Sequence, residues 1–130
     1  MLGINYLAVV VATVVAFVGS AVWYMVFGKQ RTALSSAAAS QTRPSPRMVL
    51  IELVRTLVLA AILSGLVARL GIADWSGAVG LALALWIGFP VILLSGSVMY
   101  ENVPWKLAAI HAGDWLVKLL IITLILSLWH

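Results

Sequence analysis

The stretch INYLAVVVATVVAFVGSAVWYMVF, from Ile4 to Phe27, decides the fold because it is long, apolar and free of charge. A helix that crosses a bilayer needs about 20 mostly apolar residues, since each residue advances the helix by about 1.5 Å. Three further stretches meet this requirement. The sequence therefore predicts four membrane-spanning helices, at about 4–27, 48–70, 75–100 and 104–129.

The composition supports a membrane environment for the whole chain. Of the 130 residues, 64% are hydrophobic and 9% are charged, and the mean hydropathy is +1.14. A soluble domain carries roughly 25% charged residues. Cysteine is absent, which excludes disulfides, thiolate metal ligands and cysteine nucleophiles. We predict an all-α polytopic membrane protein whose four helices form a single transmembrane domain, residues 1–130.

The longest connection, residues 28–47, is rich in Ser, Ala, Thr and Pro. Pro44 and Pro46 disfavour helix directly before the second span, so we expect a mobile linker. A short surface helix around residues 32–39 is the alternative. The other connections, at 71–74 and 101–103, are short. Short connections force neighbouring helices to run antiparallel, which predicts an antiparallel bundle.

Basic residues in the long linker indicate the orientation of the chain. They are Lys29, Arg31, Arg43 and Arg47. Because Lys and Arg stay preferentially on the cytoplasmic side, we place the linker inside and both termini outside. The net charge of +4 is then a topology signal, and we expect no nucleic-acid partner. Anionic lipid headgroups are a candidate partner of the linker.

Two stripes of small residues favour close helix contacts, because helices in lipid associate through tight packing. One stripe lies in the first span and the other in the third. Their members are Ala8, Ala12, Ala16 and Ser20, and then Gly80, Ala84 and Gly88. We expect these contacts within one chain or between copies. In the third span, Pro90 lacks an amide hydrogen and predicts a kink.

Five ionisable residues fall inside the apolar stretches. Glu52 and Arg55 belong to the second span, and His111, Asp114 and Lys118 to the fourth. Residues at i, i+3 and i+7 share one side of a helix, so each set lies on a single face. The simplest arrangement places the two helices side by side. Arg55 would then pair with Asp114, Glu52 would lie near His111, and Lys118 would reach back to Asp114.

This polar cluster has two interpretations. As an electrostatic clasp, the charges of Glu52, Arg55, Asp114 and Lys118 sum to zero, which lowers the cost of placing them in lipid. As a proton or ion pathway, the cluster would use His111, a residue type that titrates near neutral pH, and Asp114 as a relay. Catalysis is the weakest option, because the chain has no HExxH or GxSxG motif. We predict no enzyme activity, no metal and no cofactor.

Motifs near both ends of the chain carry a family resemblance. They comprise an Asn that opens the first span before LAVVVA, the segment GSAVWYMVFGK at 19–29, and YENVPWKLAAIHAGDWLV at 100–117. The motif residues are Asn5, Trp23, Tyr24, Gly28, Lys29, Pro104, Trp105 and Gly113. In these features the chain resembles the DUF1761 family of small bacterial integral membrane proteins of unknown function. The resemblance implies four helices and a bacterial plasma membrane, and it implies no activity.

The chain departs from the family pattern inside the fourth span. Members of the family typically read Ile-Asn-Ala-Gly-Tyr where this chain reads IHAGD. His111 and Asp114 therefore replace an Asn and a Tyr, which keeps the polar character and makes it ionisable. This difference favours a local specialisation.

We therefore expect a small integral membrane protein of unknown activity, either an oligomeric channel or a transporter with a buried charged cluster. The alternative is a structural or regulatory membrane subunit that binds a partner protein or lipid, with the charges serving helix packing. A subunit of this size rarely encloses a pore alone, so a transport function predicts a homo-oligomer.

Overall fold

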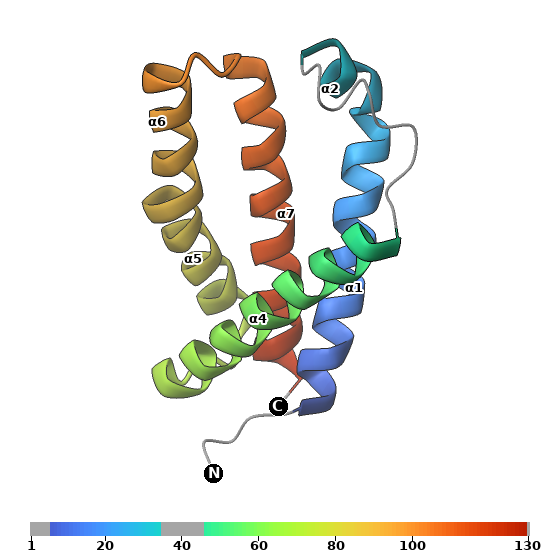
Figure 1. Cartoon of the computed structure of the whole chain (residues 1–130). Coiled ribbons are helices and arrows are strands. Elements are labelled where there is room, and N and C mark those ends of the chain that lie inside the picture. The colour runs from blue at the N-terminus through green and yellow to red at the C-terminus, as the bar shows by residue number, and fades with distance from the viewer. Residues whose placement is uncertain (1–5, 35–45, 130) are drawn as a thin grey trace.

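A computed structural model describes residues 6–34 and 46–129 of the chain (Figure 1). Throughout these residues the structure consists of helices and short connections, without strands. The helices are α1 (Tyr6–Val26), α2 (Gly28–Leu34), α4 (Pro46–Leu70), α5 (Trp75–Trp86), the π-helix η1 (Ile87–Val91), α6 (Ile92–Tyr100) and α7 (Trp105–Leu128). With α5, η1 and α6 taken as one continuous helix, four helices are long and apolar enough to cross a membrane. The predicted all-α fold class is confirmed.

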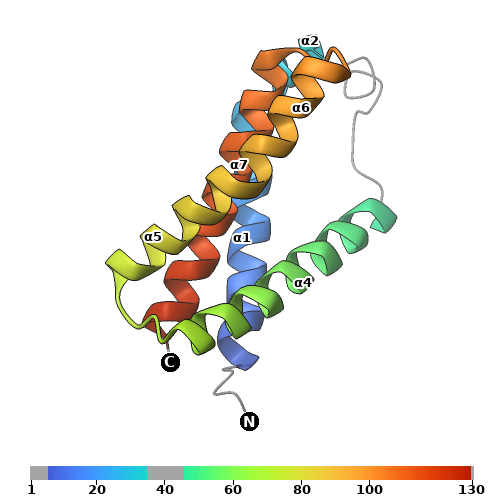
Figure 2. The same cartoon turned by 90° about the vertical axis from the view of Figure 1, so that its left-hand side faces the viewer.

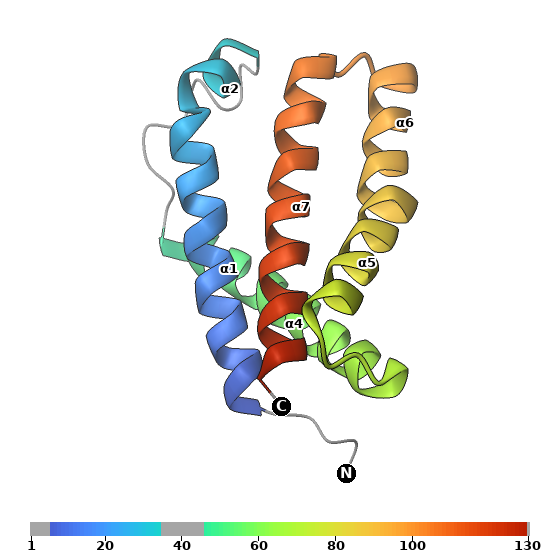
Figure 3. The same cartoon turned by 180° about the vertical axis from the view of Figure 1, so that it is seen from behind.

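Helix α7 forms the centre of the molecule. Figure 3 shows α7 between α1 on one side and α5 with α6 on the other. Helix α4 crosses in front of α7 in the view of Figure 1, and it contacts both α7 and α1. As a result α7 carries more buried residues than any other helix among the described residues, including the charged Asp114 and Lys118.

Helix α4 is inclined steeply to the other helices. It begins level with the middle of α1 and α7 and slopes toward the end of the molecule where α1 begins and α7 ends (Figures 1 and 2). Its buried residues all lie in its second part, from Thr56 onward. The first part of α4 diverges from the bundle, as Figure 2 shows from the side. The antiparallel arrangement expected from the short connections therefore stays a prediction.

The small residues of the first span lie where α1 meets its neighbours. Ala8, Ala12 and Ala16 are fully buried, and Ser20 is almost so. The three alanine side chains pack in one core with Leu63 from α4 and with apolar residues of α7. Because they are small, the backbone of α1 can approach the other helices closely.

The small residues of the third span lie elsewhere. Gly80, Ala84 and Gly88 are exposed, so the close contact expected of them within one chain is not made. Helix α5 instead buries Ala78 and Ala82. The sequence places small residues on two faces of this helix, so their spacing alone does not indicate which face packs. A contact of the exposed face with another copy stays a prediction.

The turn between α4 and α5 is built from local hydrogen bonds. Gly71 has a φ of +66°, a left-handed conformation that suits glycine at a helix end. The amides of Gly71 and Ile72 donate to the carbonyl oxygens of Ala68 and Val67, which terminates α4 in a Schellman motif. Asp74 then caps α5 by accepting a hydrogen bond from the amide of Gly77 at 3.1 Å. This tight turn sets α5 beside the end of α4.

Pro90 distorts the third span. It lies in the π-helix η1, between α5 and α6, and is buried. A proline in a helix has no amide hydrogen to donate and collides with the carbonyl four residues earlier, and a wider turn relieves both problems. In Figure 1, α5 lies against α7, and α6 continues at an angle to α5 and stands further from α7.

The linker expected at 28–47 is helical at both of its ends. Residues Gly28–Leu34 form α2, and α4 already begins at Pro46. Proline is compatible with the first turn of a helix, because an amide there has no helical acceptor. The prediction of a mobile linker is therefore wrong for residues 28–34. A helix is present there, as the alternative prediction had it, but it begins at Gly28 and not near residue 32. Residues 35–45 of the linker lie outside the described residues.

Candidate functional site

An ion pair lies inside α7. Nζ of Lys118 is 3.1 Å from Oδ2 of Asp114, four residues earlier on the same helix face. Only 8% of the Lys118 side chain and 3% of the Asp114 side chain are exposed. Nζ of Lys118 also lies 5.3 Å from the ring centroid of Trp115, within range of a cation–π interaction. The predicted contact between Lys118 and Asp114 is present.

Helix α1 supplies a second partner for Asp114. Oγ of Ser20 donates a hydrogen bond to Oδ1 of Asp114 at 2.5 Å. The two carboxylate oxygens thus have different partners, a hydroxyl and an ammonium group. We expected Ser20 only as a packing residue. Its small side chain allows α1 to approach α7, and its hydroxyl then reaches the carboxylate.

Helix α4 joins the same cluster through Glu52. Oε1 of Glu52 is 3.4 Å from Nζ of Lys118, and Oε2 accepts a hydrogen bond from Nη1 of Arg55 at 2.8 Å. The structure therefore corrects the expected pairing of Arg55 with Asp114. Arg55 finds a carboxylate three residues earlier on its own helix, and the first part of α4 diverges from α7. Lys118 is the cation that neutralises Asp114.

Together these side chains form a charge ladder, which we define as Arg55, Glu52, Lys118 and Asp114 in that order. Cations and carboxylates alternate along it, and the formal charges cancel. Side-chain exposure decreases along the ladder, from 63% at Arg55 and 33% at Glu52 to 8% at Lys118 and 3% at Asp114. The charge ladder therefore leads from the surface of the molecule to its interior.

His111 lies apart from the charge ladder. Its Nδ1 is 2.7 Å from the hydroxyl oxygen of Tyr24 on α1. His111 was expected near Glu52, and the hydrogen bond described for it is with Tyr24 of α1. Tyr24 and Ser20 are four residues apart on α1, and their partners His111 and Asp114 are three apart on α7. Two polar pairs therefore connect α1 to α7 at successive turns.

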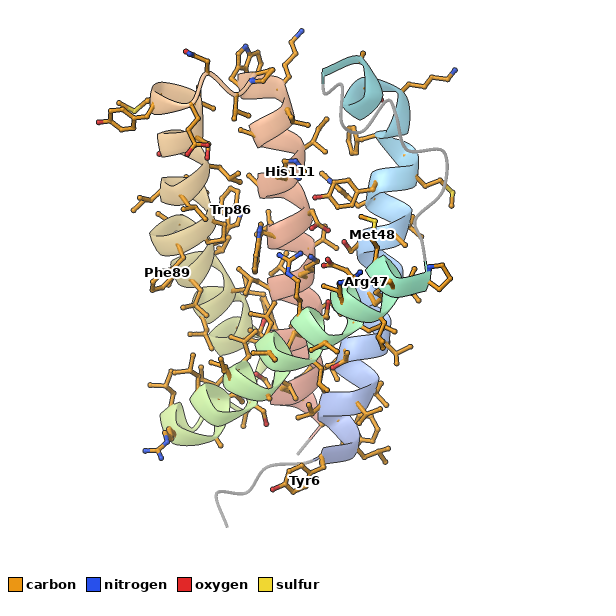
Figure 4. All side chains as sticks on the ribbon, in the orientation of Figure 1. Tyr6, Arg47, Met48, Trp86, Phe89 and His111 are labelled. Carbon is orange, nitrogen blue, oxygen red and sulfur yellow. The ribbon has the colours of Figure 1, made fainter. Side chains whose placement is uncertain are left out.

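Two indole groups hold α7 from opposite sides. Nε1 of Trp23 on α1 donates to the carbonyl oxygen of Ile110 at 2.8 Å. Nε1 of Trp86, at the end of α5, donates to the carbonyl oxygen of Ala112, also at 2.8 Å, and Figure 4 shows Trp86 between these helices. A buried indole N–H requires an acceptor. These bonds fix α7 at the level directly before Asp114. Sequence reasoning did not single out Trp86.

Gly113 has a steric role beside Trp23. A Cβ atom at this position would overlap the ring of Trp23. Glycine therefore allows the indole to lie against the backbone of α7 and to reach the carbonyl of Ile110. Two motif residues from opposite ends of the chain, Trp23 and Gly113, thus meet in the structure.

The remaining motif residues mark helix ends. Gly28 begins α2, with Lys29 exposed in its first turn. Pro104 precedes α7 as its N-cap residue, and Trp105 is exposed at the first position of that helix. Asn5 lies outside the described residues. Gly28, Lys29, Pro104 and Trp105 take no part in the charge ladder.

The donor set does not suit a metal ion. Among residues 6–34 and 46–129, no group of three His, Asp or Glu side chains converges. Both carboxylates of the charge ladder are already neutralised by cations. What the site offers chemically is a chain of charged groups within contact distance of each other.

Four apolar helices around a buried, self-compensating set of charges fit a polytopic membrane protein. The chain belongs to the DUF1761 family, described as a protein of unknown function, whose pattern matches residues 7–127. The predicted family is therefore confirmed over nearly the whole chain. No curated protein and no solved structure matches the chain.

Proposed function

We propose that this chain is a small multi-pass membrane protein that moves protons or small ions along its charge ladder, as a channel or transporter assembled from several copies. One observation carries the proposal: a continuous series of charged side chains leads from the exposed Arg55 to the buried Asp114. Intramembrane ionisable residues are costly in lipid, and in membrane proteins they commonly mark ion pathways or proton relays.

The geometry supports a relay through exchange of partners. Lys118 contacts both carboxylates, at 3.1 Å to Asp114 and 3.4 Å to Glu52. A small shift of its flexible side chain would strengthen one contact and weaken the other. A proton or cation that binds at Glu52 would release Lys118 toward Asp114. The hydroxyl of Ser20 supplies a further proton-bearing group at the inner end of the ladder.

A structural or regulatory role is the second candidate, and the complete pairing of the charges favours it. The ladder connects α4 to α7, and Ser20 connects α7 to α1, so the cluster also fixes three helices relative to each other. In this role the protein would bind a partner protein or lipid, and the charges would serve helix packing alone.

We further propose that the protein lies in a bacterial plasma membrane with both termini outside. The basic residues Lys29 and Arg47 flank the segment between α1 and α4, and the positive-inside rule places such a segment in the cytoplasm. Anionic lipid headgroups are a candidate ligand of this basic segment. We propose no enzyme activity, because the charge ladder contains no unpaired nucleophile or base.

Flux through liposomes tests the transport proposal. Purified protein in liposomes should carry a proton or cation current, and Asp114→Asn should abolish it while thermal unfolding still shows a folded protein. Glu101→Gln is the matched control, because Glu101 is an exposed carboxylate outside the charge ladder. Equal flux through Asp114→Asn and Glu101→Gln would contradict transport. Absence of flux in the wild-type protein, with partner binding intact, would favour the structural role.

A further inference from the structure

An arginine is exposed in the middle of an apolar helix face. Arg55 exposes 63% of its side chain. At about 100° per residue, Ile51, Val58 and Ile62 lie within roughly 60° of Arg55 around the axis of α4. All three are exposed apolar residues. We call these four residues the α4 stripe.

The first part of α4 has little support from its own chain. From Pro46 to Arg55 none of the residues is buried. This part diverges from the bundle and begins level with the middle of α1 and α7 (Figures 2 and 4). Arg47 and Met48, labelled in Figure 4, mark that level. Arg55 lies about two and a half turns further along α4, so it is placed at the depth of the bundle interior and not at its end.

Lipid is a poor environment for this arrangement. A guanidinium group carries five N–H donors. Within the described part of the chain its recorded partner is Oε2 of Glu52, and 63% of the side chain is exposed. Acyl chains offer no acceptor for the N–H donors of the guanidinium. The apolar residues of the α4 stripe would suit lipid, but Arg55 among them does not.

We propose that the α4 stripe is an interface with a second copy of this chain, in which Arg55 of each copy pairs with Glu52 of the other. The two residues are three apart and carry opposite charges, so the surface is complementary to itself. A two-fold interface requires this property. When residue 55 of the first copy contacts residue 52 of the second, residue 52 of the first copy also contacts residue 55 of the second. The apolar residues around Arg55 would pack against their equivalents and exclude lipid.

The interface joins the charge ladders of two copies. In the pair of copies, the exposed ends of the two ladders meet, and each Arg55 gains the Glu52 of the second copy as a further partner beside its own Glu52. This inference rests on the proposed function only in its requirement for several copies. The ladders would then form one series of charges that crosses the interface.

Disulfide cross-linking tests the interface directly. The chain contains no cysteine, so single substitutions report one position each. Ile51→Cys and Val58→Cys should form disulfide-linked dimers in native membranes. Leu50→Cys and Leu57→Cys are matched controls, because they are exposed positions of the same helix on its other side, roughly 140–160° around the axis from Arg55. They should form several times less dimer.

Equal cross-linking at the stripe and control positions would overturn the proposal, as would cross-linking at Ala84→Cys on the exposed face of α5 with none at the α4 stripe. A charge exchange gives an independent test. Arg55→Glu and Glu52→Arg copies, tagged differently, should each lose self-association and should associate with each other when expressed together. Failure of the mixed pair to form would contradict the pairing.

The two proposals fail separately. Dimers at the α4 stripe without ion flux would remove the transport function and leave the interface established. Flux with no cross-linking at the α4 stripe would place the pathway within one copy or at another face, and would overturn the interface.

Discussion

Lys118 on α7 reaches Glu52 on α4, with 3.4 Å between Nζ and Oε1. This contact connects a nearly inaccessible ion pair to a helix whose first part diverges from the bundle. It gives the buried carboxylate of Asp114 a route to the surface through charged groups alone. Stability and the proposed transport would both depend on Lys118, because it is shared between the two carboxylates.

Replacing Lys118 should therefore destabilise the protein strongly. Lys118→Met keeps the apolar stem but leaves the buried Asp114 without its cation. Removing one partner of a buried ion pair costs about 3–5 kcal/mol. The loss should appear in chemical unfolding of the protein in detergent micelles. Lys106→Met, at the exposed start of α7, should change stability little.

A second substitution shows whether the stability lost in Lys118→Met comes from the unpaired charge of Asp114. Asp114→Asn should recover part of the stability lost in Lys118→Met, because the uncompensated charge is removed. Arg55 and Asp114 belong to the same ladder but share no recorded contact, so a double-mutant cycle should give a smaller coupling energy for them than for Lys118 and Asp114. A strong coupling between Arg55 and Asp114 would contradict the order of the charge ladder.

The hydroxyl of Ser20 should contribute measurably to stability. Ser20→Ala preserves the small size that α1 needs and removes the hydrogen bond to Asp114. Leaving a buried acceptor unsatisfied costs about 1–3 kcal/mol, which unfolding in detergent would detect. Ser95→Ala is the control, because that hydroxyl is exposed and bonds to a carbonyl of its own helix at 2.7 Å. If both substitutions have the same effect, Ser20 does not hold Asp114.

Gly113→Ala should disturb the contact between α1 and α7. The added methyl group would overlap the ring of Trp23, and such overpacking typically costs 1–3 kcal/mol. Tryptophan fluorescence should shift as the indole is displaced. Gly96→Ala is matched, because a Cβ there meets no atom within 4 Å. It should be neutral or stabilising, since glycine lowers helix stability by about 0.5–1 kcal/mol relative to alanine.

Tyr24→Phe tests the second polar pair between α1 and α7. The substitution removes the hydroxyl that lies 2.7 Å from Nδ1 of His111. A hydrogen bond of this kind contributes about 0.5–1.5 kcal/mol, and the effect should shrink when His111 is also replaced. Tyr100→Phe, at an exposed tyrosine, is the control. Additive effects of Tyr24 and His111 would argue against a direct bond.

The helices were predictable from the sequence because a bilayer imposes a strict length and composition on each span. Backbone groups in lipid must be satisfied within the segment, so long apolar stretches become helices. Pro46 was the exception. From the sequence it is expected to disfavour helix directly before the second span, although a proline fits well in the first turn of a helix.

The pairing of the charges was harder to predict. Spacing shows that Glu52 and Arg55 share a face, but it does not give the slope of α4 relative to α7. That slope brings Glu52 to Lys118 and leaves Arg55 outside. The contact of α1 with α7 could have been predicted. Ser20 and Tyr24 lie one helical turn apart, as do Asp114 and His111, and polar groups in a span need partners.

Access of water to the neighbourhood of Asp114 tests the central claim, that the charge ladder connects the buried carboxylate to solvent. Ser20→Cys places the only thiol beside Asp114 with a minimal change in size, and its reaction with a small water-soluble thiol reagent can be timed in intact membranes. Ala12→Cys, two turns away on the same buried face of α1, is the control. We predict that the thiol at position 20 reacts and that the thiol at position 12 does not. Equal protection of both thiols would contradict the account.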